Sequence, residues 1–306
     1  MRRGLALGVL LTLGALSFVV SANQQGGAQQ PKVVQVEKLK DNLFVLKGGG
    51  GNTAVFVRAT DVVVVDAKLP GWGQPLLDKI KELTTKPVST IINTHTHFDH
   101  VSGNVEFPAT VEVVTQENTK ANMMKMAPVT GLNQQPQPNI FTVNNGRGLP
   151  KKTFKDKMTL GSGNDRIDLY YFGRGHTNGD AWVLFPSLRI LHAGDMFPGK
   201  NMPIMDANNG GSGVAYTDTL SKAAKTVTAV DTIITGHSTQ MTLADLKEYA
   251  EFMRDFRDSV QEAKKAGKLA EKVANGWQVP AKYQGYGKPN PVQLKTWVQV
   301  TMDELK

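Results

Sequence analysis

The chain has 306 residues, a formal net charge of +8 at pH 7, 40% hydrophobic residues and no cysteine. This length accommodates one large domain or two small ones, and the apolar content is sufficient for a hydrophobic core. The absence of cysteine excludes disulfide bonds, thiolate metal ligands and a cysteine nucleophile. The lysines are dispersed among acidic residues without a single basic face. This pattern argues against nucleic-acid binding and leaves a mild attraction for anionic small molecules.

The N-terminal segment is typical of a secretory signal peptide. Arg2 and Arg3 precede an apolar run from Leu5 to Val20, and small residues before Asn23 offer a cleavage site. The run is short for a membrane span, so an uncleaved anchor is the less favoured alternative. We expect a signal peptide over residues 1–22, no stable membrane insertion after its removal, and a periplasmic or secreted protein.

Residues 23–30 are rich in Gly and Gln and predict a flexible tether, which leaves residues 31–306 as the folded domain. Short β-rich runs follow the tether, at residues 33–36, 43–46, 53–57 and 62–65. The Gly48 to Gly51 turn leads into a strand and lacks the Lys-Ser/Thr ending of a phosphate-binding loop. It therefore predicts a hairpin at the rim of a site.

Helical and strand patterns then alternate, which favours an α/β layered fold. We expect helices at residues 74–83, 116–126, 214–227, 243–266 and 294–305, and strands at 88–92, 111–114, 167–172, 181–185, 189–193 and 232–234. Two long connections, 127–150 and 199–213, are expected to shape substrate choice. The last helices form a C-terminal extension. With no internal repeat at solenoid periods, the pattern predicts a single domain.

The strand at 88–92 leads directly into a segment with three histidines and an aspartate. The segment reads Asn93-Thr94-His95-Thr96-His97-Phe98-Asp99-His100. His95, His97 and Asp99 project to the same side of an extended chain, whereas His100 requires the chain to turn. Neutral imidazole and carboxylate are the ligands that zinc prefers, followed by manganese and iron. The segment therefore predicts a metal site.

Four motifs of the chain resemble, in the same order, those of the metallo-β-lactamase superfamily of hydrolases. They are the His-x-His-x-Asp-His segment at residues 95–100, Gly-His-Thr-Asn-Gly-Asp at 175–180, His-Ala-Gly-Asp at 192–195 and Gly-His at 236–237. The resemblance spans nearly all of the mature chain. It implies a four-layer αββα sandwich with metal ions at one edge.

The resemblance also implies how two metal ions would be held. His95, His97 and His176 would hold the first ion, Asp99, His100 and His237 the second, and Asp195 would bridge them. The lack of cysteine excludes the subclasses in which cysteine holds the second ion. Two divalent ions about 3.5–4 Å apart lower the pKa of a bridging water to about 7, which provides a hydroxide for attack on a carbonyl carbon. Asp99 would orient this hydroxide or relay its proton.

Other residues are weaker candidates. His192 lies inside a strand, so we expect a buried imidazole that supports the ligands. Asn178 is expected to shape the turn after His176. Lys200 and Asn201 follow Asp195 near the distance at which some β-lactamases bind the substrate carboxylate, although the offset does not match. Asp66, at a strand end, is expected to support a neighbouring loop.

The function expected from these features is that of an exported dinuclear-zinc hydrolase acting on an ester, lactone, thioester or amide bond of a small molecule. Export suits β-lactam hydrolysis, but a bridging Asp195 resembles the glyoxalase II and lactonase branches more than the dedicated β-lactamases. The alternatives are a mononuclear iron oxygenase of the same fold and a secreted zinc-binding protein without turnover. A nucleophilic serine is not expected, because no Gly-x-Ser-x-Gly stretch is present.

Overall fold

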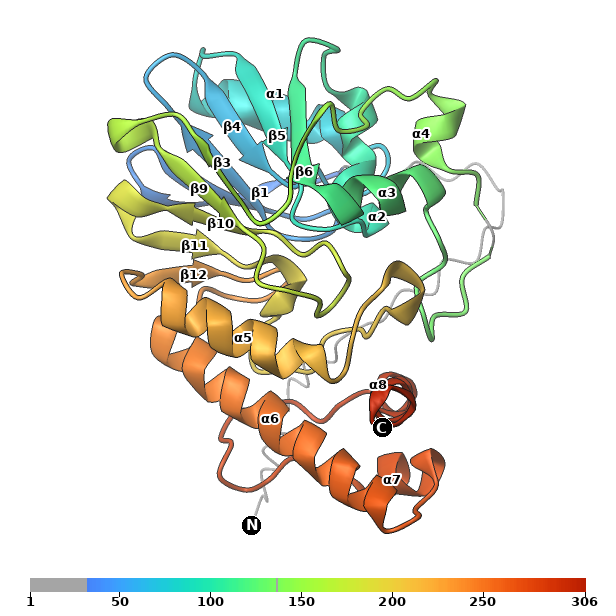
Figure 1. Cartoon of the computed structure of the whole chain (residues 1–306). Helices are drawn as coiled ribbons and strands as arrows, with labels where there is room; N and C mark the ends of the chain where they lie inside the picture. The colour runs from blue at the N-terminus through green and yellow to red at the C-terminus, as the bar shows by residue number, and fades with distance from the viewer. Residues whose placement is uncertain (1–31, 136) are drawn as a thin grey trace, which may run out of the picture. The chain divides into compact units, whose positions relative to one another are not determined.

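Two stacked β-sheets form the centre of the structure, and helices cover their outer faces (Figure 1). The first sheet contains, in spatial order, β1 (Gln35–Lys40), β2 (Leu43–Lys47), β3 (Thr53–Val57), β4 (Val62–Val65), β5 (Val88–Ile92), β6 (Glu112–Gln116) and β7 (Lys152–Phe154). The second contains β12 (Thr232–Ile234), β11 (Ile190–His192), β10 (Trp182–Phe185), β9 (Ile167–Tyr170) and β8 (Lys157–Leu160). The layers are therefore those of the αββα sandwich predicted above.

This computed structural model describes residues 32–135 and 137–306. The predicted signal peptide at 1–22 and the tether at 23–30 lie outside the described residues. Residues Lys32–Lys306 form one compact unit. Within the described part of the chain, no helix has both the length and the apolar character needed to cross a membrane.

The helices are amphipathic segments or short turns between strands. The α-helices are α1 (Gly73–Leu83), α2 (Phe98–Val101), α3 (Glu117–Lys125), α4 (Ile140–Val143), α5 (Ala215–Thr226), α6 (Leu243–Lys265), α7 (Ala270–Gly276) and α8 (Pro291–Glu304). The 3₁₀-helices are η1 (Ser102–Glu106), η2 (Gly163–Asp165), η3 (Pro186–Leu188), η4 (Gly194–Met196) and η5 (Ala207–Asn209). Local sequence sets several ends: α6 starts at a capping box between Thr242 and Asp245, and α8 starts at Asn290 followed by Pro291.

Parallel strand pairs bring distant parts of the chain to one edge of each sheet. In the first sheet β4, β5, β6 and β7 are parallel neighbours, and in the second β11 and β12 are parallel. The carboxyl ends of parallel strands lie at the same edge, which is where ligands bind in layered α/β folds. The loop that follows β5 therefore starts beside the loop that follows β4, and the loop that follows β11 starts beside the loop that follows β12.

Strand β4 shows how the sequence builds the core. Its four valines are all buried: Val63 and Val65 pack between the sheets, whereas Val62 and Val64 face α1. A central strand that is covered on both faces reads as a continuous apolar run. The second sheet alternates in the same way, since Val183 faces the first sheet while Trp182 faces the helices α5 to α8.

The elements that the sequence pattern did not predict are short or polar. These are β7, β8, α2, α4, α7 and the 3₁₀-helices, together with the first strand, which runs from Gln35 to Lys40 and not over residues 33–36. Strand β1 lies at the edge of its sheet and carries Lys and Glu, as edge strands commonly do. Such a composition gives little apolar signal.

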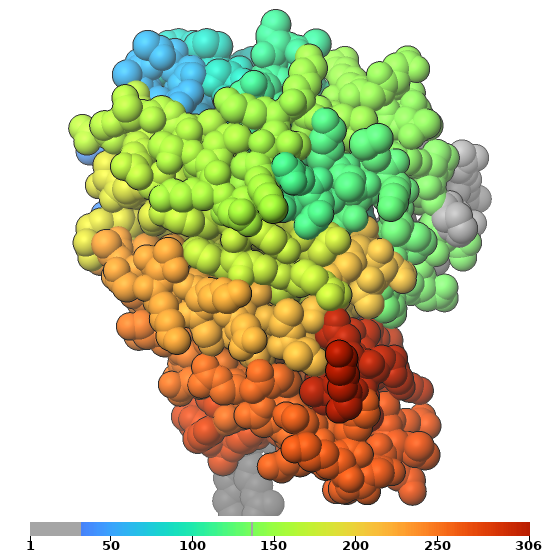
Figure 2. Space-filling view, in the orientation of Figure 1, coloured from blue at the N-terminus to red at the C-terminus, as the bar shows by residue number. Residues whose placement is uncertain are grey.

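The C-terminal extension is fastened to the loop that precedes α5. Trp297 of α8 is fully buried, packs against Tyr216 and Phe256, and donates its indole N–H to Pro203 O at 2.6 Å. Near the end of the same helix, Glu304 accepts hydrogen bonds from Ser212 Oγ and Val214 N–H. Figure 2 shows the orange and red surfaces of α6 and α8 packed below the residues around 200–215.

Replacing Trp297 with alanine should destabilise the protein by about 3–5 kcal/mol, because it leaves a large cavity and an unpaired Pro203 carbonyl. Chemical denaturation followed by circular dichroism measures this free energy. The control is Val292→Ala on the exposed side of the same helix, where the side chain is 58% exposed. Equal unfolding free energies for the two variants would show that α8 is not packed as described.

Candidate metal centre

Seven side chains from four loops converge at one edge of the sandwich. His95, His97, Asp99 and His100 follow β5, His176 follows β9, Asp195 follows β11 and His237 follows β12. Their ligand atoms form two groups, each with all atoms within 4.8 Å of one another. The first cluster is His95, His97, His176 and Asp195, and the second cluster is Asp99, His100 and His237. The structure thus brings together every residue named above as a candidate ligand.

The first cluster is buried and closely spaced. His97 Nδ1 lies 3.1 Å from His176 Nε2, which lies 3.6 Å from Asp195 Oδ2. His95 Nε2 is 3.9 Å from the same oxygen. Ligand atoms about 2.0–2.1 Å from a tetrahedral zinc ion are about 3.3–3.4 Å from one another. The spacing is therefore that of atoms that surround one small cation.

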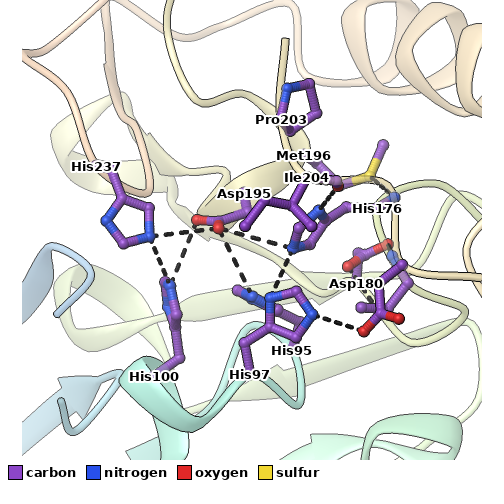
Figure 3. Close-up of polar contacts among 12 residues, drawn as sticks. His95, His97, His100, His176, Asp180, Asp195, Met196, Pro203, Ile204 and His237 are labelled. Atoms are coloured by element: carbon purple, nitrogen blue, oxygen red, sulfur yellow. Dashed lines mark hydrogen bonds and ion pairs between the residues drawn. The ribbon is translucent and has the colours of Figure 1, made fainter. Parts of the chain in front are cut away.

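Asp195 joins the two clusters. Its Oδ2 atom is 3.3 Å from His237 Nε2, and its Oδ1 atom is 3.4 Å from His100 Nε2 (Figure 3). Asp99 Oδ2 completes the second cluster at 3.3 Å from His237 Nε2 and 3.6 Å from His100 Nε2. The second cluster is the open side of the site, since the His237 side chain is 42% exposed whereas His95 and His176 are buried.

The tautomers of His97 and His176 direct their lone pairs at each other. His97 Nε2–H donates to Asp206 Oδ2 at 2.8 Å, and His176 Nδ1–H donates to Ile204 O at 2.6 Å. The remaining nitrogens, 3.1 Å apart, are then both acceptors in the neutral rings and cannot bond to each other. A cation between them resolves this contact.

His95 and His100 are held in the same way through Thr94 and Asp66. The Thr94 hydroxyl donates to Asp66 Oδ2, so it accepts from His95 Nδ1–H, and His100 Nδ1–H donates to Asp66 Oδ2 at 2.7 Å. His95 Nε2 and Asp195 Oδ1 are then buried without any hydrogen-bond partner among the described residues. Such unpaired polar atoms are costly to bury unless an ion binds them. The residues present therefore fit a divalent metal site.

The electrostatics of the two clusters differ. Burial lowers the pKa of His176 to about 4 and holds the pKa of His95 well below its ordinary value. Burial also opposes a charge on His100, but Asp99, Asp195 and Asp66 outweigh it and raise the pKa of that ring to about 10. Asp195 likewise raises the pKa of His237, against the effect of burial. His95 and His176 of the first cluster are therefore neutral at pH 7, whereas His100 of the second cluster binds a proton.

The weaker candidates lie around the clusters. His192 is buried, donates Nε2–H to Asn52 O at 3.0 Å and accepts at Nδ1 from the Gly194 N–H beside Asp195. Asn52 in turn bonds the loop of His237 through Thr235 O and Ser238 O. Asn178 accepts from Asn122 Nδ2 of α3.

Lys200 and Asn201 contact other parts of the protein. Lys200 Nζ is 3.1 Å from Glu248 Oε1 of α6 and 3.4 Å from Gln284 O, and the Lys200 carbonyl accepts from Gly287 N–H. Asn201 N–H donates to Gly199 O. Among the described residues, none of these contacts is with the seven clustered side chains. Lys200 thus fastens the C-terminal tail in this structure, through Gln284 and Gly287.

The most important residue that sequence analysis missed is Asp206. It accepts from His97, from the backbone and hydroxyl of Thr130, and from Asn209. It therefore joins the two long connections, 127–150 and 199–213, to a ring of the first cluster. Asp206 followed by Asn209 is a local capping pattern that could have been recognised. Its bond to His97, 109 residues away, has no local signal.

Phe141, in the middle of the first long connection, is buried and packs against residues of and next to α2, the helix that carries His100. From the sequence, this connection is expected to shape substrate choice. Phe141 is fully buried with Val101, Val105 and Met123 under the helix that carries His100. At this point the connection contributes to the core.

The model of the metallo-beta-lactamase superfamily matches residues 46–237, which is more than half of the chain. The chain therefore belongs to this superfamily. It is 26% identical over 178 residues to a protein of Elizabethkingia meningoseptica named metallo-beta-lactamase type 2, a match that covers 54% of this chain and 63% of the relative. It is 29% identical over 174 residues to the hydroxyacylglutathione hydrolase of Nostoc punctiforme, covering 56% and 54% of the two chains. Each match spans less than two thirds of the relative.

Solved structures agree on the fold. The crystal structure of the DIM-1 metallo-beta-lactamase has a TM-score of 0.58 at 19% identity, covering 74% of this chain and 98% of that chain. A metallo-beta-lactamase from Pontibacter korlensis gives 0.58 at 19% identity, covering 72% and 99%. About a quarter of the present chain lies outside these similarities.

Replacing Asp206 with asparagine should weaken metal binding by the first cluster about 10–100-fold, because the uncharged amide holds His97 less firmly. Competition with a chromophoric chelator measures the affinity. Asp218→Asn, at an exposed position of α5, is the matched control. An unchanged affinity in Asp206→Asn would contradict the orienting role of Asp206.

Metal binding by the second cluster should depend strongly on pH. An ion there must displace protons held at pH 7 by His100, with its pKa of about 10, whereas His95 and His176 are already neutral. The affinity of the second cluster should rise about tenfold per pH unit for each proton displaced, up to about pH 10. Isothermal titration calorimetry in buffers of different ionisation enthalpy counts these protons. Equal proton release by the two clusters would contradict this assignment.

Proposed function

We propose that this protein is an exported dinuclear-zinc hydrolase that opens an ester, lactone, thioester or amide bond of a small molecule. The observation that carries the proposal is the convergence of five imidazoles around Asp195, four of which are held from behind by a hydrogen bond. Export is inferred from the signal-peptide pattern of residues 1–22.

Each ion would have three ligands of its own and share one. His95, His97 and His176 would hold the first ion, Asp99, His100 and His237 would hold the second, and Asp195 would be shared by both. The contacts of Asp195 Oδ2 with His95, His176 and His237, at 3.9, 3.6 and 3.3 Å, support the bridge. Seven ligands with a shared carboxylate favour two ions over the single iron of an oxygenase.

Two bound divalent ions supply an activated water at neutral pH and polarise the carbonyl group of a substrate. The protein's own residues arrange that chemistry. Asp99 lies at the open side with its side chain 20% exposed, so its Oδ2 atom can orient a water or accept a proton. The buried first cluster excludes solvent from one side, so a substrate reaches the site past Asp99 and His237.

The substrate class follows from the site and from the named relatives. One relative is named as a β-lactamase and another as a hydrolase of hydroxyacylglutathione, which is a thioester. The chain has no cysteine, so it lacks the ligand that holds the second ion in the cysteine-containing subclasses. We therefore rank lactones and thioesters first, with β-lactam hydrolysis as a side activity.

A panel of an aryl ester, a lactone, a thioester and nitrocefin, assayed with and without a chelator, tests this function. We expect hydrolysis of at least one substrate, its loss on chelation and its recovery with zinc. Asp195→Asn should lower kcat at least about a hundredfold, because it removes the charge shared by both ions. The exposed Asp231→Asn is the control.

The metal content of protein purified without added metal provides an independent check. Two zinc ions per chain agree with the proposal, whereas a single iron per chain would favour the oxygenase. No hydrolysis across the panel by protein loaded with zinc would leave a zinc-binding protein without turnover.

A further inference from the structure

Lys68 is a buried charged residue to which the proposed mechanism gives no role. Its side chain is fully buried, and its backbone has a left-handed φ of 77°. It follows β4 by three residues, next to Asp66, whose φ of 65° is also positive. Positive φ is uncommon for residues other than glycine and is retained where the surroundings impose it.

The ammonium group of Lys68 closes the glycine turn between β2 and β3. Its Nζ atom donates to Leu46 O and to Gly51 O, each at 2.6 Å. These two carbonyls flank the turn of Gly48 to Gly51, one near the end of β2 and one just before β3. No carboxylate forms an ion pair with Lys68 among the described residues. The group therefore serves the turn.

The glycine turn packs directly on the second cluster. Gly51 N–H donates to Asp99 O at 3.2 Å. A Cβ atom added at Gly51 would overlap the His100 ring, and one at Gly50 would overlap the backbone of Asp99. The turn thus forms a wall against these two ligands with no space for a side chain.

The backbone around Lys68 supports the same ligands from the other side. Gly103 N–H donates to Lys68 O at 3.0 Å, and Ala67 N–H donates to His100 O at 2.7 Å. Asp66 holds His100 Nδ1–H. The segment from Asp66 to Lys68 therefore lies behind Asp99 and His100, and its last side chain reaches across to the turn in front.

An ammonium in this position is costly to maintain. Burial lowers the pKa of Lys68 to about 7, although Asp66 and Asp99 act in the opposite direction. A buried charge is weak evidence for stability, because replacing it with an apolar side chain of similar size is often neutral. The contacts of Lys68 point instead to the geometry of the neighbouring cluster.

We propose that Lys68 is a positioning residue for the second metal site, where it holds the glycine turn against Asp99 and His100. The inference rests on the proposed two-ion function for the identity of that site. Its distinctive consequence is selectivity, since the first cluster is supported by Thr94, Asp206 and Ile204 and makes no contact with the turn among the interactions described above.

The experiment compares Lys68→Met with wild type in stepwise zinc titration against a chromophoric chelator and in the visible spectrum of the cobalt-substituted protein. His237→Ala and His176→Ala identify the signals of the second and first ions. Lys86→Met is the control, because Lys86 is partly buried and, like Lys68, donates to a carbonyl, Arg58 O, at 2.6 Å. That contact lies before the start of β5, whereas the metal-site residues His95 to His100 follow its end. Circular dichroism verifies folding, and Lys68→Gln replaces Lys68→Met if the latter does not fold.

We expect Lys68→Met to lower the affinity for the second ion about 10–100-fold and to leave the first within about threefold. With a hydrolysed substrate, kcat should fall while KM changes little. Wild-type affinities for both ions, or an equal loss at both, would overturn the positioning role. The zinc affinities and cobalt spectra are measured without substrate. If the protein hydrolyses no substrate, the proposed function is refuted, but the titration still decides whether Lys68 positions the second site. A wild-type chain that binds one ion would refute both.

Discussion

The site depends on the hydrogen bonds that four of its five imidazoles make on the side facing away from the clusters. Thr94, Asp206, Asp66 and the Ile204 carbonyl occupy one nitrogen of His95, His97, His100 and His176, respectively. Each bond fixes the tautomer and the direction of the other nitrogen. Lone pairs that would otherwise be free to turn away are thereby forced into one small volume. The arrangement of these residues thus fits a divalent cation at this point.

These supporting groups lie on different segments from the ligands that they hold. Asp66 follows β4, the strand parallel to β5, so a short side chain reaches the His100 ring. Asp206 and Ile204 belong to the loop after Asp195, and this loop also receives Thr130 from the first long connection. The sheet edge brings the ligands together, and the loops then fix their orientation. Changes in the loops are therefore transmitted to the metal site.

The sequence was most informative where function and local structure coincide. The seven candidate ligands follow strands that read clearly as apolar runs, so both the edge and the residues could be predicted. The groups that hold these ligands in place were harder to predict from the sequence. The Ile204 carbonyl belongs to the backbone and has no side-chain signature. Lys68 resembles a surface lysine in the sequence, and only the fold shows that it follows β4 and reaches the turn that follows β2. Strands β7 and β8 are short and contain lysine, so their pairing depends on tertiary context.

The C-terminal extension bears on the first cluster through a single loop. It lies beyond the residues matched by the family model, yet Trp297 bonds Pro203, next to the Ile204 that holds His176. Glu304 bonds Ser212 and Val214 at the other end of the loop that contains Asp206. Both ends of the supporting loop are therefore fastened to α8. The part of the chain outside the family match stabilises ligands inside it, so the extension is structurally continuous with the metal centre.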